Sequence, residues 1–171
     1  GIREQPRSRG LGDVYKRQFL ADALDRIVSG YKGGEPQGSA RAVAASQMLS
    51  VDMAHAIHPN YADKHEAGNP HVVGRGPVIK VKANQAYATD AETAGHFDAL
   101  CRSVDVKAQH FVTRSDLACG STIGPISAAR VGIRTADVGN PMLAMHSCRE
   151  MAGTEDVEPM VDVLSAYLMG A

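Results

Sequence analysis

The chain has 171 residues, of which 44% are hydrophobic and 22% charged, and this composition excludes a disordered tail, a collagen-like fibre and a small disulfide scaffold. Lys and Arg total 18 against 19 for Asp and Glu, so the net charge of -1 gives no electrostatic reason to expect nucleic acid or an anionic membrane as a partner. No apolar run approaches the roughly 20 residues of a membrane helix, and the N-terminus lacks an apolar signal core. We therefore expect a soluble, cytoplasmic protein with neither nucleic-acid nor membrane partners.

The chain opens with an Arg-rich stretch, residues 1–18, that has no apolar periodicity. We interpret this stretch as a leader that is either disordered or not native to the protein. Apolar residues then recur at helical spacing from Phe19 to Ile27, and Gly30 ends the predicted helix. Residues 31–40 form a glycine-rich loop, and residues 19–171 make up the domain itself.

Short apolar runs alternate with helix signals over the rest of the chain. The predicted strands occupy residues 47–54, 78–81, 109–114 and 132–138. Thr89 and Glu92 form a capping box that opens a helix reaching about Val104, and residues 120–130 predict a turn followed by a short helix. Thr154 is expected to cap a last helix.

This alternation predicts an α/β fold with a mixed or mostly parallel sheet flanked by helices. In such folds, functional groups gather at the carboxyl ends of the strands. The rule brings three features to one edge: Asp52 near the end of the first strand, the turn at residues 137–139 after the fourth, and His146 shortly beyond it.

Three cysteines, Cys101, Cys119 and Cys148, are far apart and form no CxxC pair. This pattern predicts neither a zinc ribbon nor a disulfide framework, and it favours a reducing compartment. Cys119 precedes a glycine-rich stretch that lacks the GxxxxGK[ST] pattern of a nucleotide-binding P-loop. We interpret Cys119 as a small buried residue and not as a nucleophile, because the spacing supplies no partner histidine.

The densest set of chemically active side chains lies at residues 52–66, which hold three His, two Asp and one Glu. Such a set suits zinc, which takes nitrogen and oxygen donors in open catalytic sites. The alternative is that Asp52 caps the following turn and that the histidines are solvated. The apolar neighbours of His146 favour a hydrogen-bonded histidine of the core.

Four strings occur in one order along the chain: SVDMAHAIHPNYADKHE, GPVIKV, CGSTIGPISAARVGIRTADVGNP and MLAMHSCREM. Together they resemble the aspartyl aminopeptidases, the M18 family of zinc metallopeptidases, from about Ser46 to about Leu168. The resemblance implies the C-terminal part of the catalytic domain of a di-zinc aminopeptidase that removes N-terminal Asp or Glu from peptides. It also implies a homo-oligomer at full length.

The resemblance assigns roles to five residues. Asp52 of the VDMAH string is similar to a ligand of one zinc ion that also contacts the substrate, and His146 of the AMHS string is similar to a ligand of the other. His55, Lys80 and Tyr87 match substrate-binding positions. In this view the Lys80 ammonium pairs with the acidic side chain of the N-terminal residue. Judged by position alone, Lys80 would be a solvated strand residue and Tyr87 a loop aromatic.

The family pattern also requires a further His, a bridging Asp and a pair of Glu, one of which is the general base. In the family these residues lie upstream of the VDMAH string, and residues 19–50 contain nothing similar. We therefore expect no general base within this chain, weak zinc binding and no peptidase activity of the chain alone. One alternative is a short non-catalytic protein that keeps the fold as an assembly or interaction module. Another is a related aminopeptidase with a neutral substrate preference, which Lys80 disfavours.

Overall fold

The computed structural model describes residues 11–32, 35–118, 120 and 123–170. Within this part of the chain, one sheet has the strand order β1 (Gln47–Val51), β5 (Arg134–Gly139), β3 (Val78–Val81), β4 (Gln109–Val112). A smaller sheet has the order β2 (Ala54–His55), β6 (Pro141–Leu143), β7 (Met151–Ala152). The helices are α1 (Leu11–Lys32), α2 (Gly38–Ala44), α3 (Ala91–Ser103), α4 (Ile123–Val131) and α5 (Val157–Met169), with 3-10 turns η1 (Pro59–Lys64) and η2 (Thr154–Asp156).

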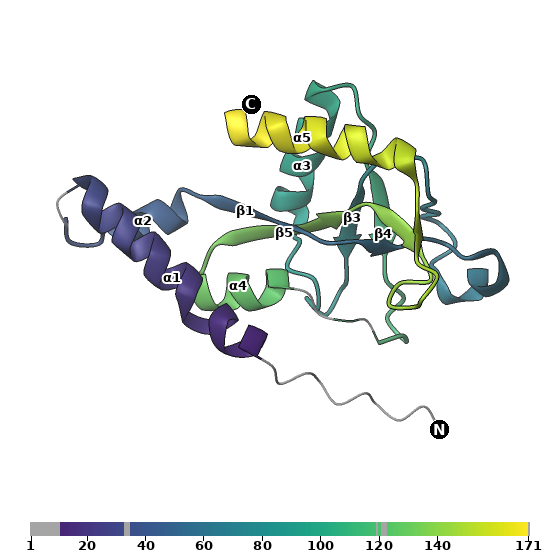
Figure 1. Cartoon of the computed structure of the whole chain (residues 1–171), viewed down its shortest axis with the longest axis horizontal. Coiled ribbons are helices and arrows are strands. Elements are labelled where there is room, and N and C mark those ends of the chain that lie inside the picture. The colour runs from purple at the N-terminus through teal and green to yellow at the C-terminus, as the bar shows by residue number, and fades with distance from the viewer. Residues whose placement is uncertain (1–10, 33–34, 119, 121–122, 171) are drawn as a thin grey trace.

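The larger sheet is mixed, in agreement with the predicted α/β class. β1 and β5 are parallel, β3 and β4 are parallel, and β3 and β5 run antiparallel. Helices α3 and α5 lie over one face of this sheet, while α4, in contact with α1, lies on the other (Figure 1). Cover on both faces explains why five of the six residues of β5 are buried.

The main core lies between the sheet and helices α3 and α5. Its fully buried members are apolar residues of β3, β5, α3 and α5: Ile79, Ala136, Val138, Phe97, Leu100, Cys101 and Val163. A second, smaller cluster joins Ala54, Val78, Tyr87 and Phe111 near the place where the two sheets meet. The predicted site residues lie around this second cluster.

Two neighbouring segments cross together from the larger sheet to the smaller one, and we call them the crossover pair (residues 51–54 and 138–141). β1 pairs with β5 up to Val51 and Val138, and β2 then pairs with β6 from Ala54 and Pro141. The predicted strand 47–54 is therefore two strands in two sheets, because the chain bends at Asp52. Sequence periodicity placed the break correctly but gave no sign of the second sheet.

The helices differ from the prediction in four places. The predicted loop at residues 31–40 is shorter, because α1 continues past Gly30 to Lys32 and α2 begins at Gly38. α1 begins at Leu11, eight residues before Phe19, so residues 11–18 of the predicted leader are helical; residues 1–10 lie outside the described residues, and whether the leader is native stays a prediction. α3 is capped by Asp90, whose carboxylate accepts the Thr93 amide, and not by Thr89. The last helix has no Thr154 cap, because Thr154 lies in η2 and α5 begins only at Val157.

Candidate functional site

Asp52 lies in the crossover pair, directly after the carboxyl end of β1. Its amide donates to the Val138 carbonyl at 2.9 Å, which continues the β1–β5 ladder by one residue. Its carboxylate accepts the Met53 amide at 2.8 Å, and the residue is exposed. The backbone is therefore fixed while the carboxylate faces outward, an arrangement suited to a metal ligand.

Lys80 lies in the centre of β3 and is only 1% exposed, which overturns the position-based expectation of a solvated strand residue. Its Nζ donates to the main-chain oxygen of Asp52 at 3.3 Å and lies 5.4 Å from the centroid of the Tyr87 ring. Burial lowers the pKa of the ammonium, while the nearby Asp52 and Asp137 carboxylates oppose the shift. Tyr87 lies in the loop between β3 and α3, as its position predicts, but its ring is buried, 6.2 Å from the Phe111 ring.

His55 belongs to β2, and the charges of several other site residues shift its pKa. Burial lowers its pKa, and the charges of His146 and Lys80 lower it further, whereas Asp52 raises it. Its main-chain oxygen contacts Nε2 of the buried His71. Asp52, Lys80 and His146 are thus close enough to His55 to influence its charge, so four of the five predicted residues lie in one region of the structure.

His146 lies in the loop after β6 and is exposed, so the prediction of a core histidine is wrong. Ala144 and His146 have positive φ values of 55° and 65°, a conformation that non-glycine residues rarely adopt. The His146 amide donates to the Glu150 carboxylate, which holds the turn closed.

Two of the predicted site residues have the side-chain chemistry that zinc requires. A carboxylate from Asp52 and an imidazole from His146 are donor types that zinc takes, and both residues are exposed. Among the described residues, however, no group of three or more His, Cys, Asp or Glu is placed to hold a metal ion. The donor types fit zinc, but these two residues alone are not a complete ligand set for a zinc ion.

Two acidic residues of the 52–66 segment make local contacts instead of joining these five. Glu66 accepts the Gly68 amide at 2.7 Å and the Asn69 side chain at 2.7 Å, and these bonds lower its pKa. Asp63 forms an exposed pair with Lys64 at 3.7 Å. Cys119 lies outside the described residues.

Sequence reasoning missed the roles of Asp137 and Thr89. Asp137 is fully buried in β5, accepts the Ala88 amide at 2.7 Å and acts on the charge of Lys80. Thr89 donates to the Asp137 main-chain oxygen at 3.4 Å and accepts the Asp137 amide at 2.8 Å. These contacts fix the Ala88–Thr89 segment, just after Tyr87, against the strand. Their sequence signal is weak, because the partners are 48 or more positions apart.

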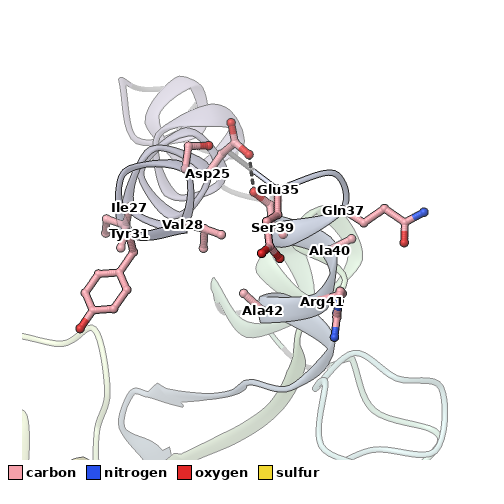
Figure 2. Close-up of a pocket in the computed structure, with 12 residues that line it drawn as sticks. Asp25, Ile27, Val28, Tyr31, Glu35, Gln37, Ser39, Ala40, Arg41 and Ala42 are labelled. Atoms are coloured by element: carbon pink, nitrogen blue, oxygen red, sulfur yellow. Dashed lines mark hydrogen bonds between the residues drawn. The ribbon is translucent and has the colours of Figure 1, made fainter. Parts of the chain in front are cut away.

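A hollow of about 620 Å³ lies elsewhere, between α1 and α2. Figure 2 shows Asp25 of α1 facing Ser39 of α2, and the Ser39 hydroxyl donates to this carboxylate. The described residues that line the hollow include none of the five predicted site residues. We therefore place the candidate site at the crossover pair, not here.

The chain belongs to the M18 family: the model of the family described as "Aminopeptidase I zinc metalloprotease (M18)" matches residues 12–168. It is 51% identical over 151 residues to a probable M18 family aminopeptidase 2 of Pseudomonas aeruginosa strain UCBPP-PA14, covering 87% of this chain and 34% of that protein. A relative of the same description from Stutzerimonas stutzeri strain A1501 is 50% identical over 153 residues, covering 90% and 34%. The chain therefore spans about a third of the length of these curated relatives.

Solved structures give the same family. The chain superposes on Ape4 in its cryo-EM complex with Nbr1 with a TM-score of 0.85 and 44% identity, covering 89% of this chain and 29% of that one. For the mature Ape1 dodecamer of S. cerevisiae the TM-score is 0.77 at 28% identity, covering 88% and 33%. The partial M18 fold predicted from the sequence is confirmed.

None of the described helices is long and apolar enough to cross a bilayer.

Proposed function

We propose that this chain supplies part of a di-zinc aminopeptidase that removes N-terminal Asp or Glu from peptides. Asp52 is the ligand of one zinc ion and His146 the ligand of the other, and Asp52, His55, Lys80 and Tyr87 contact the substrate. The observation that carries the proposal is the buried Lys80 ammonium, 3.3 Å from the main-chain oxygen of Asp52. A cation fixed beside a metal ligand gives an acidic side chain its partner when the N-terminal residue lies at the metal ions.

The proposed metal chemistry needs more than this chain provides. When bound, a pair of zinc ions lowers the pKa of a bridging water and polarises the scissile carbonyl. A catalytic zinc ion normally keeps three protein ligands, whereas the proposed set offers one to each ion. The general base is proposed to be a Glu outside these 171 residues. We therefore expect weak zinc binding and no peptidase activity from the 171-residue chain by itself.

The chain's own residues supply binding and selection of the substrate. Burial holds Lys80 in one position, so little side-chain freedom remains to be lost when it pairs with a carboxylate. Its Nζ lies over the Tyr87 ring, 5.4 Å from the centroid, so the ring covers one side of the ammonium. The lowered pKa of His55 favours a neutral imidazole at pH 7, which both donates and accepts hydrogen bonds toward a substrate amide.

The assembly and compartment of the protein belong to the same proposal. The S. cerevisiae Ape1 structure to which this chain is similar is a dodecamer. By analogy we propose that the full-length protein is a homo-oligomer. Cys101 and Cys148 are free thiols in the described part of the chain, in keeping with a proposed cytoplasmic location.

The test uses a hybrid enzyme, in which the matching segment of this chain replaces its counterpart in the P. aeruginosa relative. Lys80→Met is compared with the parent hybrid on substrates that begin with Asp, Asn or Ala. Loss of a charge-assisted hydrogen bond of about 1.5–3 kcal/mol predicts a fall of about 10- to 100-fold in the preference for Asp over Asn. Lys107→Met, which removes an exposed lysine, is the control and should change nothing.

Each result bears on a different part of the proposal. An unchanged preference for Asp in Lys80→Met would remove Lys80 from the substrate site. A hybrid that binds zinc and cleaves only neutral N-termini would favour the related aminopeptidase with neutral specificity. A folded hybrid that neither binds zinc nor cleaves any substrate would favour the non-catalytic module.

A further inference from the structure

A cavity of about 420 Å³ adjoins the proposed site, bounded by β2, the turn η1 and the end of β4. His55 and Tyr87 line it, whereas Asp52, Lys80 and His146 are not part of its lining. The cavity therefore begins at the residues proposed to contact the substrate and extends away from the proposed metal ligands. Nothing in the proposed function so far uses this space.

One wall of the cavity carries two polar atoms without a partner. Phe111 lies in β4 and Thr113 directly follows it, with the Thr113 amide bonded to the Val81 carbonyl, so both side chains lie on the same side and line the cavity. The His65 ring packs near the Phe111 ring, with 5.9 Å between the centroids. Within the described residues, Thr113 Oγ1 and His65 Nδ1 are buried and have no hydrogen-bond partner. Folded proteins rarely leave such atoms unpaired, so a polar ligand at this wall would explain them.

The mouth of the cavity adds further donors. His58 Nδ1 accepts the Asn60 amide at 3.1 Å, which assigns the proton of a neutral His58 to Nε2 and makes that nitrogen a donor. Lys64 also lines the cavity, although its ammonium lies 3.7 Å from the Asp63 carboxylate at the surface. No Asp or Glu is among the described residues of the lining. A space with imidazole, hydroxyl and ammonium donors and no carboxylate fits a group that only accepts hydrogen bonds.

We propose that this cavity binds a carboxylate of the substrate one residue beyond the N-terminal residue, with His58, His65 and Thr113 as its polar contacts. The direction in which the peptide runs rests on the proposed function, which places the N-terminal residue of the substrate beside Lys80 and the metal ions. Consecutive Cα atoms are 3.8 Å apart, so the next residue leaves the Lys80 position past His55 and Tyr87 into the cavity. The carboxylate belongs to an Asp or Glu side chain at the second position or to the C-terminus of a dipeptide.

The first experiment measures binding to the 171-residue chain without metal, using dipeptides whose first residue is Ala and so makes no pair with Lys80. Ala-Glu-amide should bind at least about 10-fold more tightly than Ala-Gln-amide, with imidazole NMR shifts confined to His55, His58 and His65. Free Ala-Ala is compared with Ala-Ala-amide to test the terminal carboxylate as the other source. Equal binding of all acid and amide pairs would overturn the proposal.

Thr113→Val separates a ligand site from a structural role. The substitution removes a buried hydroxyl that has no partner in the free protein, so the thermal midpoint should stay the same or rise while binding of the carboxylate peptide weakens about 5- to 10-fold. Thr135→Val is the matched control, because the Thr135 hydroxyl donates to the Ile133 carbonyl at 3.0 Å. This control should lower the midpoint and leave binding unchanged. A lower midpoint with unchanged binding in Thr113→Val would assign Thr113 to the fold alone.

A kinetic comparison in the hybrid enzyme distinguishes failure of this inference from failure of the proposed function. Peptides that begin Asp-Glu should be cleaved about 10-fold more efficiently than peptides that begin Asp-Gln, and Thr113→Val should reduce that ratio. Equal cleavage of both would overturn the cavity's role while the proposed function stands. Selective binding of Ala-Glu-amide by the chain, together with a hybrid inactive on every Asp substrate, would retain the carboxylate site and reject the peptidase assignment.

Discussion

Replacing Gly139 by alanine tests whether the crossover pair holds the proposed site together. Gly139 is buried at the end of β5, where the two sheets meet. A methyl group there would overlap the Asp52 carbonyl oxygen and lie 3.2 Å from the Met53 Cα. Because the obstacle is backbone and not the end of a flexible side chain, the segment that carries Asp52 must move.

The magnitude follows from the contacts that this movement breaks. The Asp52 amide bonds to the Val138 carbonyl at 2.9 Å, and the Ala54 amide bonds to the Asn140 carbonyl at 2.9 Å. Each such bond contributes about 1 kcal/mol, and overpacking a filled site adds about 1–3 kcal/mol. The Asp52 oxygen also accepts the Lys80 ammonium. We expect the free energy of unfolding to fall by about 4 kcal/mol, a large share of the roughly 5–15 kcal/mol of a typical domain.

Urea denaturation followed by circular dichroism measures this change, and Gly95→Ala is the matched control. Gly95 lies in α3 with no atom within 4 Å of the added methyl group, so alanine should stabilise the protein by about 0.5–1 kcal/mol. For a slope of about 2 kcal/mol per molar urea, the Gly139→Ala midpoint should fall by about 2 M. Equal midpoints for Gly139→Ala and the parent chain would refute the idea that close backbone approach fixes Asp52.

Three further predictions concern other parts of the chain. Asp156 is fully buried and its carboxylate accepts two backbone amides at 2.7 Å each, so Asp156→Asn should lower the free energy of unfolding by about 2–3 kcal/mol in urea titrations. Burial raises the pKa of Cys101 to about 12, so iodoacetamide at pH 8 should modify the exposed Cys148 and spare Cys101 until the chain unfolds, as peptide mass spectrometry would show. Burial lowers the pKa of His65, so the unfolded state binds more protons just below pH 6.5 and stability should fall as the pH drops through that window. In a plot of thermal midpoint against pH, His65→Gln should reduce the slope in this pH window. An unchanged slope would contradict the assignment of this pH dependence to His65.

Local signals predicted the positions of β3 and β5, because each is a short segment that contains apolar residues and is bounded by turn residues. The α3 cap was misplaced by one residue, since the sequence TDAET offers two overlapping capping patterns. The structure uses Asp90 with Thr93, and Thr89 bonds to the Asp137 backbone instead. The two capping patterns are equally good locally, and the bond between Thr89 and Asp137, 48 residues away, favours the cap at Asp90.

The site was predictable only in part, because it too depends on contacts between residues far apart in the sequence. Strand alternation gives no sign that Lys80 is buried, because a lysine in a strand usually faces solvent. The carboxylates that oppose the desolvation of the ammonium, Asp52 and Asp137, come from distant parts of the chain. His146 was misjudged because its apolar neighbours suggested a core position, whereas the positive φ values at Ala144 and His146 turn the loop outward. The two unpartnered atoms of the cavity wall likewise have no signal in the sequence.

The crossover pair explains why residues so far apart in the chain act at one place. β1–β2 and β5–β6 cross between the sheets side by side, so one ladder of parallel pairing fixes both Asp52 and the start of the loop to His146. The turn η1 is anchored separately, because the Arg114 side chain donates to the Asp63 main-chain oxygen.

Substitutions in the ladder, such as Gly139→Ala, should therefore disturb both proposed zinc ligands together. Substitutions of Arg114 should alter the cavity and leave the proposed ligands in place. Zinc titration and dipeptide binding, measured on both kinds of variant, would detect this separation, and equal loss of both properties in both variants would contradict it.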